Sequence, residues 1–157
     1  MDKHFELTDK FIINAFGVKL FQIKCTRKIK YADIGDLGGY IEKEDNLSGD
    51  AWVSGNAQVS GNAWVYGDAW VYGDARVSGD ARVSNDNEHC GFDCFGSANR
   101  HTHAYKTELG KIEITCGCFL GSIEEFEKQI KETHQGNEFE RQYMAIVEVI
   151  KIKFGLK

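Results

Sequence analysis

A short polar run in the second half of the chain carries the side chains best suited to bind a small anion. A Gly-Ser turn, Gly96-Ser97, offers backbone N–H groups and a hydroxyl, and the Arg100 guanidinium can hold a phosphate or carboxylate through two parallel hydrogen bonds. In a strand, Arg100, Thr102 and Lys106 would share one face, and His101, His103 and Tyr105 the other. The pattern predicts a ligand site, and an exposed strand with a structural Arg salt bridge is the alternative. The predicted site residues are Ser97, Asn99, Arg100, Thr102, Tyr105 and Lys106.

The same region contains soft ligands of the kind that zinc prefers, all within 30 residues: His89, Cys90, Cys94, His101, His103, Cys116 and Cys118. Their spacings are Cys-x3-Cys, His-x-His and Cys-x-Cys, and none is the Cys-x2-Cys of a zinc knuckle. Cysteines two apart in a strand also occur as small buried apolar residues. We therefore expect no cofactor and no metal, and keep zinc as a weaker alternative.

His134 is a further candidate, either as a ligand contact or as a general base. It falls in the last turn of a predicted helix, where a histidine also stabilises the negative end of the helix dipole without any function. The chain contains no phosphate-binding loop, no GxGxxG motif, no paired-carboxylate signature and no Ser/His/Asp order. We therefore predict a binding protein, not an enzyme.

These candidates follow a six-residue repeat that runs from Gly39 to Asp86, with an aliphatic residue at the third position of each of eight hexads. Gly-Asn and Gly-Asp pairs supply tight corners, and small alanines follow them. This pattern resembles the hexapeptide repeat of left-handed parallel β-helices, in which three hexads make one turn. The predicted fold is mainly β, with fewer than three turns. Neighbouring turns should stack Trp52 on Trp70, Gln58 on Arg76, and Trp64 on Arg82.

The residues before each inward valine should point outward. Outward tryptophans and tyrosines form a large apolar surface, which predicts self-association, most simply as a trimer; cover by the flanking segments is the alternative. A ligand base could then stack on Trp64 or Tyr66 of a neighbouring copy. Repeat proteins of this kind include acyltransferases with a coil or loop histidine, but residues 39–86 hold no histidine and no loop insertion, which disfavours that activity.

The flanking segments divide the chain into four parts. Residues 1–38 should form a cap with strands over 11–14 and 18–25, residues 39–86 the β-helix, and residues 87–96 a connector. Residues 97–157 should form a ββαα module with strands over 100–107 and 111–119. Ser122 with Glu125 is a capping box that starts one helix, and a second begins near Asn137.

Composition limits the partners. The formal net charge is −5, so a nucleic acid polymer is not an expected partner. No apolar run is long enough to cross a membrane, and the start has no signal-peptide pattern, so we expect a cytoplasmic protein without a membrane partner. Five cysteines, an odd number, are expected to be reduced thiols.

Two groups of motifs resemble known sequences. FELTDK, VKLFQIKC and GDLGGYIEKEDNLSGDAWV resemble a family of uncharacterised hexapeptide-repeat proteins of bacteriophages, prophages and gut bacteria, over roughly residues 5 to 86. GSANRHTHAYKT, CGCFLGSIEEFEKQIKETHQGN and Tyr143 resemble a unit found in phage proteins, which usually has hydroxyl residues where this chain has His103. The resemblance implies a bacterial host cytoplasm and specifies no activity.

Together these observations predict a self-associating phage-type protein that sequesters a small anionic ligand, such as a nucleotide immune signal, and so counters host defence. A structural or assembly protein, or a module that inhibits or scaffolds a host or phage protein, is the first alternative. A degenerate acyltransferase is the second.

Overall fold

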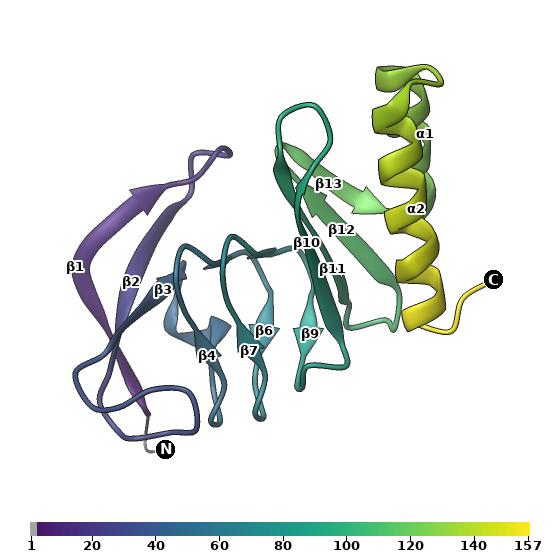
Figure 1. The fold of residues 1–157 in the computed structure, drawn as a ribbon. Helices are drawn as coiled ribbons and strands as arrows, with labels where there is room; N and C mark the ends of the chain where they lie inside the picture. The colour runs from purple at the N-terminus through teal and green to yellow at the C-terminus, as the bar shows by residue number, and fades with distance from the viewer. Residues whose placement is uncertain (1–2) are drawn as a thin grey trace.

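The computed structural model describes residues 3–157 and places the six-residue repeat in a short β-solenoid (Figure 1). Parallel pairs join residues 18 apart, so one turn of the solenoid takes three hexads. Trp52 lies beside Trp70, Gln58 beside Arg76, and Trp64 beside Arg82, which confirms the predicted stacking. The solenoid strands are β4 (Trp52–Val53), β5 (Gln58–Val59), β6 (Trp64–Val65), β7 (Trp70–Val71), β8 (Arg76–Val77) and β9 (Arg82–Val83).

The solenoid interior is filled by one valine and one alanine from each of the last six hexads, and by Ile41 and Leu47 from the first two. The valines from Val53 to Val83 are fully buried, and so are the alanines from Ala51 to Ala81. Successive turns are joined by backbone hydrogen bonds, for example from Trp52 N to the Ala69 carbonyl at 3.0 Å. The resulting sheets are small: β4 pairs with β7, β6 with β9, and β5 and β8 belong to a five-stranded sheet.

The N-terminal segment covers the first turn of the solenoid. Strands β1 (Phe5–Ile13) and β2 (Lys19–Cys25) form an antiparallel hairpin, and β3 (Leu37–Ile41) pairs antiparallel with β2 and parallel with β5. A 3-10 helix, Glu44–Asn46, lies where the first hexad of the repeat meets the second. The predicted hairpin therefore exists, although its first strand begins at Phe5 and not at residue 11.

Trp52 is buried, so the prediction that all three tryptophans point into solvent is wrong. His4 lies over the same end of the solenoid, with its Nε2 2.6 Å from the Ala51 carbonyl oxygen. A side chain at Gly38 would come within 2.8 Å of the Trp52 ring, so glycine is what lets β3 approach it. Trp70 is half-buried and stacks on Tyr31 at 4.9 Å. Only Trp64 remains exposed among the three.

The C-terminal module begins earlier and has more strands than predicted. Residues 87–96 are not a connector, because His89–Phe95 form strand β10, and the module is not ββαα, because its antiparallel sheet has four strands in the order β10-β11-β12-β13. In the segment HCGFDCF, Cys90, Phe92 and Cys94 alternate with His89, Gly91 and Asp93, and Cys90 and Phe92 pack on the core beneath the helices. The other strands are β11 (Arg100–Lys106), β12 (Ile112–Cys116) and β13 (Phe119–Ser122).

Helices α1 (Ile123–His134) and α2 (Glu138–Lys153) cover one face of this sheet (Figure 1). The capping box is confirmed: Ser122 Oγ accepts from Glu125 N, and the Glu125 carboxylate accepts from Ser122 N, each at 3.1 Å. Ile123, Phe126 and Ile130 are buried against the sheet. No helix in residues 3–157 is long and apolar enough to cross a membrane.

The opposite face of the sheet closes the second end of the solenoid. The Tyr105 ring joins the buried valines, and Thr115 Oγ1 donates to the Arg76 carbonyl at 2.7 Å. Glu108 N donates to the Asp80 carbonyl at 2.8 Å. The sheet therefore replaces the missing next turn of the solenoid.

Two corner glycines provide a test of the stacking. Gly67 and Gly73 both have positive φ (65° and 66°), but a Cβ at Gly67 would lie 2.4 Å from the Ser84 carbonyl oxygen, whereas nothing lies within 4 Å at Gly73. We expect Gly73→Ala to lower the free energy of unfolding by about 1–2 kcal/mol through backbone strain alone. Gly67→Ala should cost about 1–3 kcal/mol more, because the neighbouring turn must move. If urea unfolding showed that the two variants lose the same free energy of unfolding, the stacking of turns at Gly67 would be contradicted.

Candidate anion-binding site

Arg100 lies at the first position of β11, directly after a tight turn. Asn99 in that turn has a left-handed backbone (φ 49°). The Arg100 guanidinium lies over Gly117, between β12 and β13, where a Cβ would be only 2.8 Å from Nη1. Arg100 is exposed, and no carboxylate in residues 3–157 pairs with it. The salt bridge of the alternative reading is not formed, although the strand face at Arg100 is exposed as that reading expects, and the five N–H donors of Arg100 are available to a ligand.

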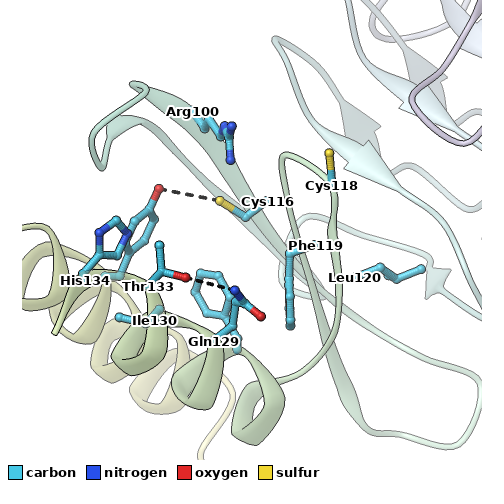
Figure 2. Close-up of a pocket in the computed structure, with 11 residues that line it drawn as sticks. Arg100, Cys116, Cys118, Phe119, Leu120, Gln129, Ile130, Thr133 and His134 are labelled. Carbon is cyan, nitrogen blue, oxygen red and sulfur yellow. Dashed lines mark hydrogen bonds between the residues drawn. The ribbon is translucent and has the colours of Figure 1, made fainter.

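Arg100 borders a cavity of about 490 Å³ between the helices and the sheet (Figure 2). Its floor is apolar and aromatic, and hydroxyl and amide groups from α1 lie at its side. Among the described residues that line it there is no aspartate or glutamate. These residues are Arg100, Cys116, Cys118, Phe119, Leu120, Phe126, Gln129, Ile130, Thr133, His134 and Tyr143.

A chain of hydrogen bonds fixes the polar wall of the cavity. Thr102 Oγ1 donates to Cys116 Sγ at 3.3 Å, and that thiol lies 3.8 Å from the Tyr143 hydroxyl. The Tyr143 hydroxyl donates to the Phe95 carbonyl at 3.4 Å. Burial and the neighbouring Cys116 raise the pKa of Tyr143 to about 12, against the opposing effect of the Arg100 charge. The phenol is therefore neutral near pH 7, and the wall adds no negative charge.

His134 lies on this cavity, at the last turn of α1. Its ring stacks on Tyr143 with centroids 5.6 Å apart and planes inclined by 23°. The close-up shows His134 on the helix and Arg100 on the sheet side of the same pocket (Figure 2). Two residues that the sequence suggested separately, 34 positions apart, thus belong to one site.

A second, polar hollow of about 340 Å³ lies on the solenoid side of Arg100. Arg76 from β8 lines it too, and its Nη1 donates to the Gly117 carbonyl at 3.0 Å. The two guanidiniums therefore flank Gly117, with Asn56, Gln58 and Asn99 as neutral polar neighbours and Asp74 as the one carboxylate in the described lining. Two cations against one anion make this hollow attractive to a phosphate or carboxylate.

The structure separates most of the other predicted site residues from Arg100. Ser97 is exposed in the turn and lines neither cavity, and Thr102 is fully buried. Tyr105 is buried in the solenoid end, where its hydroxyl donates to Glu113 Oε1 at 2.7 Å, and burial raises its pKa. Lys106 lies at the far end of β11. The prediction that these residues form one site with Arg100 is wrong, because the strand carries them away from it or into the core.

Trp64 and Tyr66 line neither cavity within one chain and stack on each other, with centroids 4.0 Å apart. Five further residues line these cavities although no sequence pattern marked them as site residues: Arg76, Phe119, Gln129, Thr133 and Tyr143. One signal for Arg76 was visible: arginine takes an outward position that tryptophan occupies in neighbouring hexads. The helix residues gave no such signal, because their pattern is that of core packing.

Three histidines on β10 and β11 form a hydrogen-bonded row behind the polar hollow. His103 is central: its Nε2 lies 2.9 Å from His89 Nδ1, and its Nδ1 lies 2.9 Å from His101 Nε2. The outer ends meet carboxylates, with His101 Nδ1 2.5 Å from Asp93 Oδ1 and His89 Nε2 3.5 Å from Asp86 Oδ1. Gly91 leaves room for the row, since a Cβ there would lie 2.6 Å from the His101 ring.

The predicted alternative of a zinc site is not formed. His89, His101 and His103 bond to one another, whereas Cys116 and Cys118 lie at the cavity on the helix side and Cys94 is exposed. Nowhere in residues 3–157 do three or more histidine, cysteine, aspartate or glutamate side chains group as a metal site. The histidines and the cysteines Cys116 and Cys118 lie on opposite sides of the sheet that contains β11.

Burial lowers the pKa of His89, and it lowers that of His103 well below its usual value.

A family model described as YdcK β-solenoid repeat matches residues 57–73 and 75–86, less than a fifth of the chain. Together with the parallel pairing at 18-residue intervals, this match shows a repeat β-solenoid protein. The match lies in the solenoid and ends before the C-terminal module that carries Arg100. No curated protein and no solved structure matches the chain significantly.

The buried histidines predict a loss of stability in acid. Burial lowers the pKa of His4, His89 and His103 below 6.5, so the unfolded chain binds more protons and the free energy of unfolding should fall as the pH drops below 6.5. Each group contributes at most about 1.4 kcal/mol per pH unit. His103→Gln should therefore show a shallower slope between pH 6.5 and 5 in urea unfolding. A slope equal to that of the wild type would contradict a neutral, buried His103.

Proposed function

We propose that this protein acts by binding, and that it sequesters a small anionic ligand such as a nucleotide. The observation that carries the proposal is Arg100: a guanidinium without a carboxylate partner, at the border of a cavity of about 490 Å³. Arginine is suited to this role because its planar fork matches phosphate and carboxylate oxygens.

The two hollows beside Arg100 suit different parts of one ligand. Arg76 and Arg100 would hold the anionic group on the solenoid side, where the neighbouring Gln58 and Asn99 offer further hydrogen bonds. A planar or apolar part would enter the cavity on the helix side, against Phe119 and Phe126. A nucleotide has both an anionic group and a planar base, whereas an inorganic anion has only the anionic group.

The site favours binding of the ligand without chemical conversion. The Tyr143 phenol and the Cys116 thiol of the cavity wall bond to each other, and the Thr102 hydroxyl behind them donates to the thiol, so none of these three groups is held ready as a nucleophile or base. We propose that the protein belongs to the phage-type hexapeptide-repeat group that its sequence resembles, with a left-handed solenoid, and that it acts in the bacterial cytoplasm as a sponge for a nucleotide immune signal.

Self-association is part of the proposal. Trp64 is 39% exposed and Tyr72 is 55% exposed on the solenoid surface, and Arg82 lies over the Trp64 ring at 5.9 Å. Aromatic and arginine side chains are what interface cores favour. A homotrimer packed through these faces would cover them. Since Trp52 is already covered within the chain, the contact would rest on Trp64, Tyr66 and Tyr72.

A protein-binding role is the second candidate, and one observation favours it. The β1–β2 hairpin exposes three large apolar side chains, Phe11, Ile13 and Phe16, of which Phe16 is 62% exposed. An assembly protein, or an inhibitor of a host protein, would use this hairpin and not Arg100. A degenerate acyltransferase has less support, because the solenoid residues 39–86 contain no histidine.

Replacing Arg100 tests the anion site directly. Arg100→Ala should weaken binding of a nucleotide by roughly 10- to 100-fold, because a hydrogen-bonded charge contributes about 1.5–3 kcal/mol. Isothermal titration with a panel of cyclic and linear nucleotides and their uncharged nucleosides measures this. Arg141→Ala, an exposed arginine on α2 that lines neither cavity, is the matched control and should bind like the wild type. Absence of heat and of thermal shift with every compound would overturn the proposal.

The trimer can be tested separately by measuring mass in solution. Light scattering should give three times the chain mass of 17.7 kDa. Trp64→Glu places a charge in the proposed contact and should shift the mass toward that of one chain, while the circular dichroism spectrum stays unchanged. A wild-type protein with the mass of a single chain at high micromolar concentration would show that the trimer is wrong.

A further inference from the structure

The turn between β12 and β13 contacts both guanidiniums of the proposed anion site through one residue. Cys116 pairs with Phe119, so the turn consists of Gly117 and Cys118 alone, and Gly117 has a left-handed backbone (φ 59°). Two-residue turns between antiparallel strands need such a conformation, and glycine adopts it without strain. Gly117 therefore has a reason to be glycine in the fold itself, and the two arginines give it a second one.

Arg76 is held by this turn and by the strand that leads into it. Its backbone carbonyl accepts from Thr115 Oγ1 at 2.7 Å, and its Nη1 donates to the Gly117 carbonyl at 3.0 Å. A side chain that is bonded at its backbone and at its tip keeps few conformations. The C-terminal module thus fixes the guanidinium of a solenoid residue beside Gly117.

Arg100 lies across the same glycine, on the side where another residue would have its Cβ. Thr102 pairs with Cys116, so the start of β11 lies beside the turn. A Cβ on Gly117 would lie 2.8 Å from Arg100 Nη1, 3.0 Å from its Cδ and 3.1 Å from its Cζ. Any side chain at this position would displace the guanidinium. Because the displaced atoms are the far end of a flexible side chain, the main effect would be on the position of Arg100 and not on folding.

The two guanidiniums have no anionic partner of their own. Neither Arg76 nor Arg100 forms an ion pair within residues 3–157. Asp74, the one carboxylate in the described lining of the polar hollow, accepts from Asn56 Nδ2 at 3.5 Å instead. Both arginines are therefore free to bind the same anion in this hollow.

The number of free oxygens on a phosphate decides whether it can satisfy two guanidiniums. Each guanidinium donates parallel hydrogen bonds to a pair of oxygens. A terminal phosphate has three free oxygens and a charge of about −1.5 to −2 at pH 7, so it can accept from both. A phosphate within a diester has two free oxygens and a single negative charge. One guanidinium uses its oxygens fully, so the second adds little.

We propose that Gly117 is the positioning residue of the anion site, and that the pair of guanidiniums it sets selects a terminal phosphate over a phosphodiester. This selectivity rests on the proposed binding function and narrows its ligand to a phosphate monoester, such as a linear nucleotide. Cyclic nucleotides, whose phosphates are diesters, bind more weakly.

Two probes of nearly equal shape separate the two kinds of phosphate: phenyl phosphate, a monoester, and methyl phenyl phosphate, a diester. Titration of the full chain at pH 7.5, followed through the side-chain N–H NMR signals of Arg76 and Arg100, should show phenyl phosphate binding roughly 10-fold tighter or more. Arg76→Ala should weaken phenyl phosphate binding and remove most of this preference, because a single guanidinium remains.

Gly117→Ala tests the positioning role. It should weaken phenyl phosphate binding roughly 5-fold or more and shift the Arg100 side-chain signal of the free protein. Gly110→Ala is the matched control: Gly110 also has positive φ (77°), in the neighbouring turn of the same sheet, but nothing lies within 4 Å of its Cβ position. It should bind like the wild type. In an Arg100→Ala background, Gly117→Ala should cause little further loss, since it acts through Arg100.

The possible failures are distinguishable. Equal affinity for the two probes, in a protein whose binding depends on Arg100, would overturn the selectivity and leave the proposed function standing. Gly117→Ala binding as well as Gly110→Ala would overturn the positioning role in the same way. No change in the arginine signals with phenyl phosphate would overturn both parts of the proposal, and if the nucleotide panel also gave no heat, the proposed function would fall with them.

Discussion

Both ends of a short β-solenoid expose backbone N–H and C=O groups that have no neighbouring strand, and this chain must satisfy them with non-repetitive segments. At the first end β2 pairs with β3, the strand that contains the start of the repeat, and His4 bonds to Ala51. At the second end the C-terminal sheet inserts Tyr105 and binds the Arg76 carbonyl through Thr115. The candidate site lies at this second joint, so closing the solenoid is also what brings Arg76 beside Arg100.

Strand β11 then separates two kinds of chemistry. Its first residue, Arg100, borders the cavity beneath the helices and the polar hollow beside the solenoid, whereas His101 and His103 face the carboxylates of β10 and its surroundings. A chain with an overall charge of −5 thus has a local surplus of positive charge at Arg76 and Arg100, with the carboxylates of Asp86 and Asp93 at a neighbouring hollow. Alternation along β11 separates Arg100 from His101, because neighbouring residues of a strand point to opposite faces of the sheet.

Tertiary contacts overrode a local signal at Trp52. Trp52 follows the same pattern as Trp64, yet the N-terminal segment buries it, and only the absence of a side chain at Gly38 permits this approach. Strand β10 was predicted to be a connector because of its polar residues and glycines, although Cys90, Phe92 and Cys94 alternate along it, and it pairs with β11. Conversely, the helix bounded by Ser122 was predicted well, since its capping box and the buried stripe of Ile123, Phe126 and Ile130 are local features.

The sequence by itself determined the solenoid, its 18-residue turn, its valine interior, and Arg100 and His134 as candidate residues. A strict period repeats the same backbone environment, so one hexad predicts the next. Only the tertiary structure decided that Arg100, His134 and Tyr143 border one cavity, that Thr102 and Tyr105 are buried, and that three histidines bond in a row. These groupings depend on how the C-terminal sheet docks on the solenoid and on its own helices, a long-range choice that no local pattern encodes.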